Sequence, residues 1–309
     1  MRVLVTGGAG FIGSHVVELL INQGYTPIVL DDLSNGDINH IPNGVKFYNV
    51  QLLSEKIEQI FKTEKPDAVI HLAAQINVAK SIKDPVEDAA TNILGTINLL
   101  NCCKLFTTKK FIFSSSSAVY GESDKPISED APTNPISFYG TSKLVSEIYI
   151  KLFNHLYGIP YTILRYANVF GPRQKSDGEG GVVSIFINQL LNAQTPCIYG
   201  DGKQTRDFVF VEDVAQANVS AIKHGKNETF NIGYNKQTSI NDLYKIISEK
   251  INSTISPVYK NPLNGNILYS QLDNHKAIEK LKWQPVSDVE SGLEKTILYF
   301  KQQQIKKKD

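Results

Sequence analysis

Cysteine is scarce in this chain, with three residues among 309. Cys102 and Cys103 are adjacent in an apolar, helix-like stretch, and Cys197 stands apart, a distribution that suits buried thiols better than a disulfide framework. No two cysteines have the spacing of metal ligands, so we expect no metal site. The few thiols indicate a reducing compartment, and we expect the protein to be cytoplasmic.

Long apolar runs and a surplus of one charge are also missing. No stretch reaches the ~20 apolar residues of a membrane-spanning helix, and a predicted strand begins at residue 2, which leaves no room for a signal peptide. The 32 basic and 31 acidic residues give a net charge of +1, which favours neither nucleic acid nor an anionic membrane as a partner. We interpret the lysines at 306–308 as a solvated tail.

The first half of the chain alternates short β-rich runs with helical patterns. We expect strands at 3–6, 27–30, 45–48, 68–72, 110–114 and 161–165, and helices at 11–23, 89–105 and 138–157. Strands that alternate with crossover helices predict a parallel sheet covered on both faces. The predicted fold class is therefore α/β, a doubly wound parallel sheet of the Rossmann type.

The pattern loosens after residue 165. Loops rich in Gly, Pro and Asn occur at 171–172, 178–181, 200–202 and 261–266, and a lone strand is expected at 196–199. We expect residues 1–165 to form the sheet domain, with later segments returning to it. Residues 166–309 should form mainly a smaller C-terminal α/β portion that binds substrate.

A glycine-rich loop follows the first predicted strand directly. Gly7 allows a tight turn, Gly10 lets the backbone approach a pyrophosphate, and Gly13 lets helix and strand pack closely. The N-terminus of the following helix then offers free N–H groups to phosphates. Strand, loop and helix come in the order that a dinucleotide site requires.

An acidic residue ends the second predicted strand, eighteen positions beyond Gly13. A carboxylate at Asp31 can accept both ribose hydroxyls of an adenosine and would repel a 2′-phosphate, so it favours NAD over NADP. The alternative interpretation is a turn residue before Asn35 and Gly36. Its position relative to the glycine loop favours the NAD site.

A tyrosine and a lysine lie four residues apart on one predicted helix face. A functional role for Tyr139 and Lys143 is favoured because the preceding strand ends in a run of serines at 114–117. That run should lie at the sheet edge where ligands bind. A phenol of pKa about 10 is a poor base at neutral pH. A lysine cation and a positive nicotinamide would both favour the phenolate and lower that pKa.

With these motifs in order, the sequence resembles the extended short-chain dehydrogenase/reductase superfamily and, within it, the UDP-glucose 4-epimerase group. The resemblance covers nearly the whole chain. It rests on the segments 6–15, 71–74, 84–96, 114–121, 139–143, 168–173 and 200–213.

The resemblance implies roles for individual residues. Ser116 is similar to the catalytic serine, Tyr139 to the base and Lys143 to the lysine that also holds the cofactor. Asn168 resembles an asparagine that holds the phosphates of a nucleotide sugar, and Arg206 a pyrophosphate-binding arginine. The implied NAD contacts are Gly7, Gly10, Phe11, Ile12, Gly13, Asp31, Asp32, Asn35, Gln51, Leu52, Leu72, Ala73, Ala74, Asn92, Ser114, Tyr139, Lys143 and Tyr166. The implied substrate contacts are Ser116, Asn168, Arg173, Val182, Tyr199, Arg206, Ser270 and Asp273.

The branch of the family follows from what stands after the serine. Ser117 and Ala118 occupy the positions where related dehydratases carry an Asp–Glu pair, and no Glu precedes Val119 as it does in related decarboxylases. Without an extra carboxylate, the implied reaction is a redox-neutral 4-epimerisation of a nucleotide sugar with bound NAD. Other epimerases or reductases of the superfamily stay open, as does a non-catalytic NAD-binding regulator.

Three positions depart from the family pattern. Gln51 stands where an Asp often contacts adenine, and an amide can still form that hydrogen bond. Leu263 replaces an arginine directed at the diphosphate, and Lys260 or Arg173 would have to supply a point charge instead. Ser270 is small beside the sugar C2 group, so N-acetylated sugars should fit as well as UDP-glucose and UDP-galactose.

Two further expectations concern His71 and the oligomeric state. His71 ends an apolar predicted strand, and we interpret it as structural rather than catalytic. The helices at 89–105 and 138–157 carry more apolar surface than a sheet requires. In relatives the equivalent pair forms a twofold interface, so we expect a homodimer.

Overall fold

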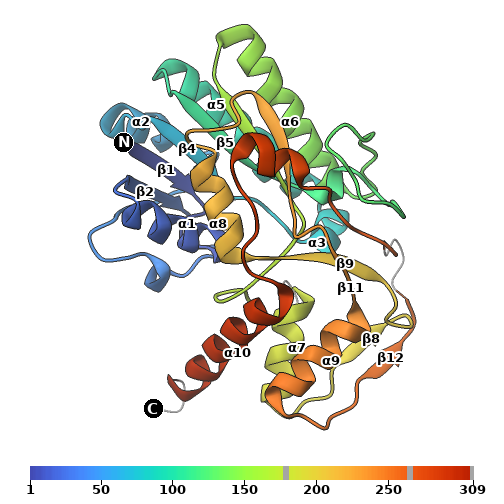
Figure 1. Ribbon diagram of the computed structural model, residues 1–309. Helices are drawn as coiled ribbons and strands as arrows, with labels where there is room; N and C mark the ends of the chain where they lie inside the picture. The colour runs from blue at the N-terminus through green and yellow to red at the C-terminus, as the bar shows by residue number, and fades with distance from the viewer. Residues whose placement is uncertain (177–180, 263–266, 307–309) are drawn as a thin grey trace.

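A seven-stranded parallel sheet forms the centre of the structure, a computed structural model that describes residues 1–176, 181–262 and 267–306. The strand order is β10-β6-β5-β4-β1-β2-β3 (Figure 1). Its strands are β1 (Arg2–Thr6), β2 (Thr26–Asp31), β3 (Lys46–Asn49), β4 (Ala68–His71), β5 (Lys110–Ser116), β6 (Tyr161–Tyr166) and β10 (Glu228–Ile232). The order in which strands are added to the sheet reverses between the parallel strands β1 and β4, so a ligand crevice is expected at the carboxyl ends of these two strands.

The predicted doubly wound parallel sheet is confirmed, and its first six strands begin and end within two residues of their predicted bounds. Apolar runs explain this agreement. Val3, Leu4 and Val5 have no exposed surface, because the sheet is covered on both faces. The seventh strand, β10, comes from the part of the chain beyond residue 166, which the alternating pattern alone did not place.

Two layers of helices cover the sheet. On one face α1 (Phe11–Asn22) packs against α8 (Val211–Ser220), and on the other α2 (Lys56–Glu64), α5 (Gly95–Leu105) and α6 (Phe138–Tyr157) pack in turn. The ends of α6 are specified locally.

The N-cap residue of α6 is Ser137, whose hydroxyl accepts a hydrogen bond from the N–H of Gly140. Gly158 then ends the helix in the left-handed conformation, with a φ of +71°. These two signals explain why the predicted bounds of this helix, 138–157, are those observed.

The helix predicted at 89–105 is wrong at its start. Asp84 caps a short helix, α4 (Pro85–Ala89), and a π-helical turn at Ala90–Leu94 joins it to α5. A further short helix, α3 (Val78–Lys83), precedes them. The wider turn cannot be predicted from a 3.6-residue period, and such turns are frequent at functional sites.

The remaining elements build a smaller portion, below the sheet in Figure 1. A three-stranded sheet orders β11 (Gln237–Ser239), β9 (Thr205–Phe210) and β7 (Asn168–Phe170), and β12 (Val258–Lys260) pairs with β8 (Cys197–Tyr199). Helices α7 (Val182–Leu191), α9 (Ile240–Ile251) and α10 (Val289–Lys306) pack on one another. Their shared core includes Phe170, Phe186, Phe210, Leu243 and Leu293.

Short helical turns complete the connections. They are the 3-10 turns η1 (Ile38–His40) and η3 (Ser117–Val119) and the π-helical turn η4 (Ala277–Leu281). Of these, η3 matters most for the site because it begins directly after Ser116.

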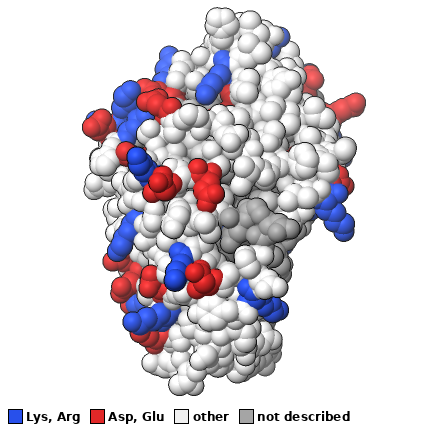
Figure 2. All heavy atoms as spheres, turned by 90° about the vertical axis from the view of Figure 1, so that its right-hand side faces the viewer, with Lys and Arg blue, Asp and Glu red and all other residues white. Residues whose placement is uncertain are grey.

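Over the described ranges, no helix is both long enough and apolar enough to cross a membrane. Among the described side chains of the face in Figure 2, acidic and basic groups lie close to one another and neither sign forms a large patch. That face therefore presents no single-sign field to a polyanion or polycation.

Candidate active site

The glycine loop between β1 and α1 is shaped for close backbone approach. Gly7 has a φ of +69°, and a Cβ there would lie 2.7 Å from the nitrogen of Ala73. A Cβ on Gly13 would lie 2.0 Å from the carbonyl oxygen of Gly7. Gly10 precedes the first turn of α1 and supplies no side-chain cap. The N-terminus of α1 is therefore left open to an anionic group such as a pyrophosphate.

Asp31 joins this loop to the end of β2. Its Oδ2 accepts a hydrogen bond from the N–H of Ala9 at 3.0 Å, and its Oδ1 accepts one from Leu33 at 2.9 Å. Burial raises the pKa of Asp31, and these two hydrogen bonds act against the rise. Each oxygen keeps a lone pair for a ribose hydroxyl. The glycine cradle and this carboxylate together fit NAD.

A buried hydrogen-bond chain supports the other wall of the crevice. Thr6 Oγ1 accepts from the backbone N–H groups of Leu72 and Ala73, both at 3.2 Å, so its own hydrogen points to His71 Nδ1 at 2.7 Å. His71 must then carry its proton on Nε2, which donates to Thr96 Oγ1 at 3.0 Å. Burial lowers the pKa of His71 to about 3. The ring is thus a neutral link between β1, β4 and α5.

The predicted catalytic residues converge at the carboxyl end of β5. Ser116 is the last residue of that strand, and its Oγ accepts from the N–H of Ala118 at 3.2 Å. Lys143 is 3% exposed, and its Nζ donates to the carbonyl of Ser114 at 2.8 Å. Tyr139 hydrogen-bonds Ser116, and its ring centroid lies 5.9 Å from the lysine Nζ. Serine, phenol and ammonium therefore share one corner of the sheet edge.

Burial dominates the electrostatics of this corner. It raises the pKa of Tyr139 to about 12, while the hydrogen bond to Ser116 lowers that pKa and the charge of Asp88 raises it. Burial also lowers the pKa of Lys143 to about 8, against the charges of Asp88 and Glu147. The sequence predicted a phenol made more acidic by its lysine and by a positive nicotinamide together. The groups of the chain itself do not produce that shift, because desolvation outweighs them.

An ion pair that sequence reasoning missed lies behind the serine. Arg165 of β6 donates from Nε and Nη2 to the two carboxylate oxygens of Glu147 on α6, at 2.9 and 2.6 Å. Ser115 Oγ donates to the same carboxylate at 2.6 Å, and Arg165 Nη1 donates to Tyr120 Oη at 2.7 Å. Both charged side chains are at most 4% exposed. The network ties α6 to β5 and β6 one residue away from Ser116.

Asn92 was predicted to contact the cofactor, but its side chain is engaged within the protein. Its Oδ1 accepts from the N–H of Gln75 at 2.9 Å, and its Nδ2 lies within hydrogen-bonding distance of the Gln75 carbonyl, Asp88 and Ser142. These contacts hold the loop that follows Ala74. Asn92 therefore shapes the crevice wall, and a direct contact with NAD stays a prediction.

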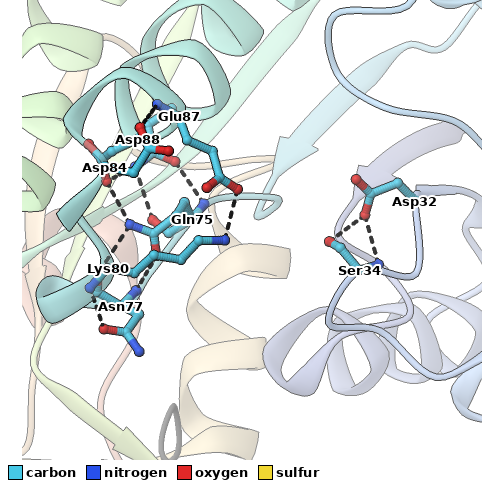
Figure 3. A network of polar contacts seen from close by, with 9 residues as sticks. Asp32, Ser34, Gln75, Asn77, Lys80, Asp84, Glu87 and Asp88 are labelled. Carbon is cyan, nitrogen blue, oxygen red and sulfur yellow. Dashed lines mark hydrogen bonds and ion pairs between the residues drawn. The ribbon is translucent and has the colours of Figure 1, made fainter.

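Three more of the predicted cofactor residues form side-chain hydrogen bonds within the protein. Asp32 Oδ1 accepts from the N–H and the hydroxyl of Ser34, which closes the turn after β2 (Figure 3). Asn35 Oδ1 accepts from Lys175 Nζ at 3.0 Å, so a residue of the later chain contacts the loop after β2. Tyr166 donates to Asn218 at 2.9 Å beside Ser114.

Two of the predicted cofactor residues lie on the loop after β3. Leu52 is buried and packs within 2.9 Å of where a Cβ on Gly95 would lie, whereas Gln51 is exposed. An exposed amide is free to meet an adenine edge, so the role of Gln51 stays a prediction.

On the substrate side, Arg206 and Ser270 are brought together by a buried carboxylate. Asp207 accepts hydrogen bonds from the N–H groups of Tyr234 and Leu272, at 2.8 and 3.1 Å, and burial raises its pKa to about 6. Arg206, next in the chain, donates from Nη1 to two backbone carbonyls, and Ser270 is 8% exposed. Asp207 is a positioning residue that the sequence did not single out.

Other predicted substrate residues are spread around this portion. Tyr199 lines an open hollow on the surface with Tyr259, Lys260 and Asn261. Asp273 pairs with His275 at 2.6 Å. Asn168 begins β7 and is exposed, and Val182 begins α7.

Arg173 lies on the cofactor side of the structure. Its Nη2 donates to Glu18 of α1 at 2.5 Å, while its buried Nη1 has no hydrogen-bond partner among the described residues. The predicted contact between Arg173 and substrate stays untested. Leu263, which departs from the family pattern, is outside the described residues.

Known proteins resemble the chain along its whole length. Residues 3–233 match the NAD-dependent epimerase/dehydratase family. A putative UDP-glucose 4-epimerase of Methanocaldococcus jannaschii is 47% identical over 301 residues, which cover 97% of this chain and 98% of that protein. The structure of UDP-glucose 4-epimerase from Thermotoga maritima with UDP-glucose has a TM-score of 0.97 at 46% identity, covering 98% and 100% of the two chains.

A second solved structure carries a different ligand. UDP-N-acetylglucosamine 4-epimerase from Methanobrevibacter ruminantium, in complex with UDP-N-acetylmuramic acid, has a TM-score of 0.93 at 37% identity and covers 98% of both chains. These likenesses include the smaller portion as well as the sheet.

The Asp31 carboxylate provides a direct test of the cofactor crevice. Asp31→Ala should weaken NAD binding about 100-fold, because two charge-assisted hydrogen bonds to ribose are lost. The protein is purified and denatured, and the NAD released is measured against protein concentration. Asp67→Asn is the matched control. Asp67 directly precedes β4, at the end of that strand opposite to the cofactor crevice, so this variant should retain NAD. Equal NAD content in both variants would place the ribose elsewhere.

Proposed function

The chain belongs to the NAD-dependent epimerase/dehydratase family, and we propose that it interconverts UDP-glucose and UDP-galactose by epimerisation at C4. The convergence of Ser116, Tyr139 and Lys143 beside the NAD crevice carries this proposal. The names of the similar proteins support it, since UDP-glucose 4-epimerases are found among them by sequence and by structure.

The segment after the serine favours epimerisation over elimination. Ser117 and Ala118 form the turn η3 directly beyond Ser116, and neither carries an ionisable group. Elimination of water from a 4-keto sugar needs an acid near the leaving hydroxyl. Without one at these positions, the keto sugar has only the return of its hydrogen as an outcome.

The residues of the chain would move one proton out and back. Tyr139, as phenolate, takes the proton of the sugar O4 hydroxyl while C4 loses hydride, which leaves a C4 ketone. Ser116 lies in hydrogen-bond contact with Tyr139 and can bridge the phenol and the sugar oxygen. After the 4-keto sugar rotates in the site to present its other face, the same phenol returns the proton to O4. No net oxidation occurs, so atoms and electrons balance.

When bound, NAD would accept the hydride, return it to the other face of C4, and stabilise the phenolate by the positive charge of its nicotinamide. Lys143 is placed to hold that end of the cofactor, because its ammonium is anchored on the carbonyl of Ser114. A cycle of this kind gains nothing from cofactor exchange, so NAD can stay bound through many turnovers.

The nucleotide would lie in the smaller portion. Arg206 supplies a cation for the diphosphate, and Lys260 borders the open hollow that Tyr199 and Tyr259 line. We propose that Lys260 provides the second charge that relatives obtain from an arginine near position 263. An aromatic wall beside a cation suits a nucleoside diphosphate.

Three further proposals complete the assignment. Residues 1–165 with returning segments form the NAD-binding part, and residues 166–309 bind mainly substrate. The protein works in the cytoplasm, in keeping with free thiols at Cys102, Cys103 and Cys197. It acts as a homodimer.

Replacement of the base tests the chemistry. Tyr139→Phe should lower the turnover of UDP-glucose by ~10²–10⁴-fold, because only the ionisable oxygen is removed. Purified protein is incubated with UDP-glucose, UDP-N-acetylglucosamine and UDP-glucuronate, and the products are separated by chromatography.

The same panel decides between the alternatives. Conversion of another sugar alone would identify a different epimerase of the family. No conversion of any sugar by the parent protein, with NAD bound, would favour the non-catalytic regulator. Turnover of Tyr139→Phe at the parent's rate would contradict the role of Tyr139.

The size of Ser270 sets which sugars fit. We propose that the enzyme also accepts UDP-N-acetylhexosamines, and the Methanobrevibacter ruminantium protein shows that a chain of this fold binds an N-acetylated UDP-sugar. Ser270→Tyr should lower kcat/KM for the N-acetylated sugar at least ~10-fold and spare UDP-glucose, because the phenol overlaps the C2 substituent. Ser270→Ala is the control. Equal losses on both sugars would move the pocket elsewhere.

The apolar faces of α5 and α6 support the homodimer. Ile148, Leu152 and Leu156 on α6 are each between 46% and 57% exposed, and Leu105 on α5 is 60% exposed. An isologous contact would bury such a patch on both subunits. Light scattering at micromolar concentration should give twice the chain mass, and Leu152→Glu should give a monomer. A monomeric parent would contradict this.

A further inference from the structure

Asp88 is a buried carboxylate held by two side-chain amides. It lies on α4, is 1% exposed, and its Oδ1 accepts from Gln75 Nε2 at 2.9 Å and Asn92 Nδ2 at 3.2 Å. A buried charge is costly unless hydrogen bonds and nearby charges stabilise it. By contrast, Glu147 has Arg165 as a bidentate partner.

The two amides connect Asp88 to the catalytic helix. Asn92 Nδ2 also lies 3.0 Å from Ser142 Oγ, and that hydroxyl donates to the carbonyl of Tyr139 at 3.0 Å. Asn92 reaches both sides because it sits in the π-helical turn between α4 and α5. Three successive hydrogen bonds therefore link the carboxylate to the backbone of Tyr139.

The second amide connects Asp88 to the crevice wall. Gln75 Oε1 accepts from the N–H of Asn77 at 2.5 Å, and Gln75 Nε2 also donates to the carbonyl of Asn77 at 3.1 Å. Figure 3 shows Asp88, Gln75 and Asn77 in one network. Asn77 caps α3, whose Ser81 Oγ accepts from the N–H of Tyr139 at 3.2 Å. The first turn of α6 is thus held from both α3 and α4.

Most of the charged groups near Tyr139 and Lys143 are neutralised by a partner, but among the described residues Asp88 is not paired in this way. From β6, Arg165 is neutralised by Glu147 of α6, and Tyr166 is uncharged because burial raises its pKa. From β4, His71 is neutral. On α3 and α4, the exposed Lys80 and Glu87 pair with each other at 2.8 Å. The remaining buried negative charge that acts on both members of the catalytic pair is Asp88.

We infer that Asp88 is a positioning residue for the proposed epimerase reaction, which clamps the first turn of α6 and keeps a fixed negative charge beside Tyr139 and Lys143. This inference rests on the proposed function. The charge favours the ammonium form of Lys143, which would otherwise lose its proton in a buried site. The same charge opposes the phenolate of Tyr139, so Asp88 sets the pH at which the base forms.

The near-isosteric Asp88→Asn removes the charge and keeps an oxygen to accept from Gln75 and Asn92. In the NAD-loaded protein the positive nicotinamide favours the phenolate, so we expect Tyr139 to release the first proton of the pair, and to release it more easily once the negative charge of Asp88 is gone. We expect the pH midpoint of Tyr139 to fall by about one unit, with the NAD content and the thermal unfolding midpoint of the parent retained.

The titration is read without any sugar. Tyrosinate absorbance of the NAD-loaded protein is recorded against pH, and the same curve of Tyr139→Phe in each background is subtracted. Glu87→Gln, on the same helix but solvent-exposed, is the matched control and should not shift the midpoint. Because no turnover is involved, this result stands apart from a failure to epimerise UDP-glucose.

A second variant keeps the inference open to refutation if Asp88→Asn does not fold. Asp88→Glu retains the charge, so its Tyr139 midpoint should stay at the parent's value even where kcat falls. A parental midpoint in a folded Asp88→Asn would overturn the inference, as would a lowered midpoint in Asp88→Glu. The acid limb of the kcat/KM profile should move with the absorbance titration.

Discussion

The buried ion pair between Arg165 and Glu147 is the contact on which the catalytic geometry depends. It joins β6 to α6, and Glu147 also accepts from Ser115, the residue before Ser116, for which we propose a catalytic role. Since α6 carries Tyr139 and Lys143 while β5 carries the serine, one carboxylate sets how the two elements lie. Removal of one partner of a buried pair typically costs about 3–5 kcal/mol. A change in the position of α6 relative to β5 and β6 that breaks this ion pair would therefore cost much of the protein's stability.

Local chemistry explains how much of this could be predicted from the sequence. The glycine loop has no room for a Cβ at Gly13. Asp31 follows at the sequence separation that a strand–helix–strand unit requires. Tyr139 and Lys143 share a helix face because they are four residues apart. Each of these signals lies within a short stretch of chain, so the sequence could predict the sheet, the glycine loop and the shared helix face of Tyr139 and Lys143, whose roles stay predictions. The parallel sheet and the NAD-dependent family are confirmed.

Contacts between distant segments could not be predicted. Glu147 occupies an ordinary helix position, and only the fold brings Arg165, 18 residues later, against it. The sequence around the π-helical turn at Ala90–Leu94 has the pattern of one long helix, so the turn could not be predicted. The contacts that link Asp88 to α6 through this turn could not be predicted either. Asp207 likewise accepts its hydrogen bonds from two loops that follow much later in the chain, so its role could not be predicted. Periodicity reports which face of an element is buried, but not which element covers it.

The central claim is that one hydrogen leaves C4 of the sugar and returns to the same carbon. UDP-glucose that carries deuterium at C4 tests it directly, with the UDP-galactose product analysed by mass spectrometry after reaction in ordinary water. We expect the product to keep deuterium at C4, because the hydrogen removed from C4 is the one that returns to it. Loss of the label to water, or a product that accumulates as the ketone, would contradict it.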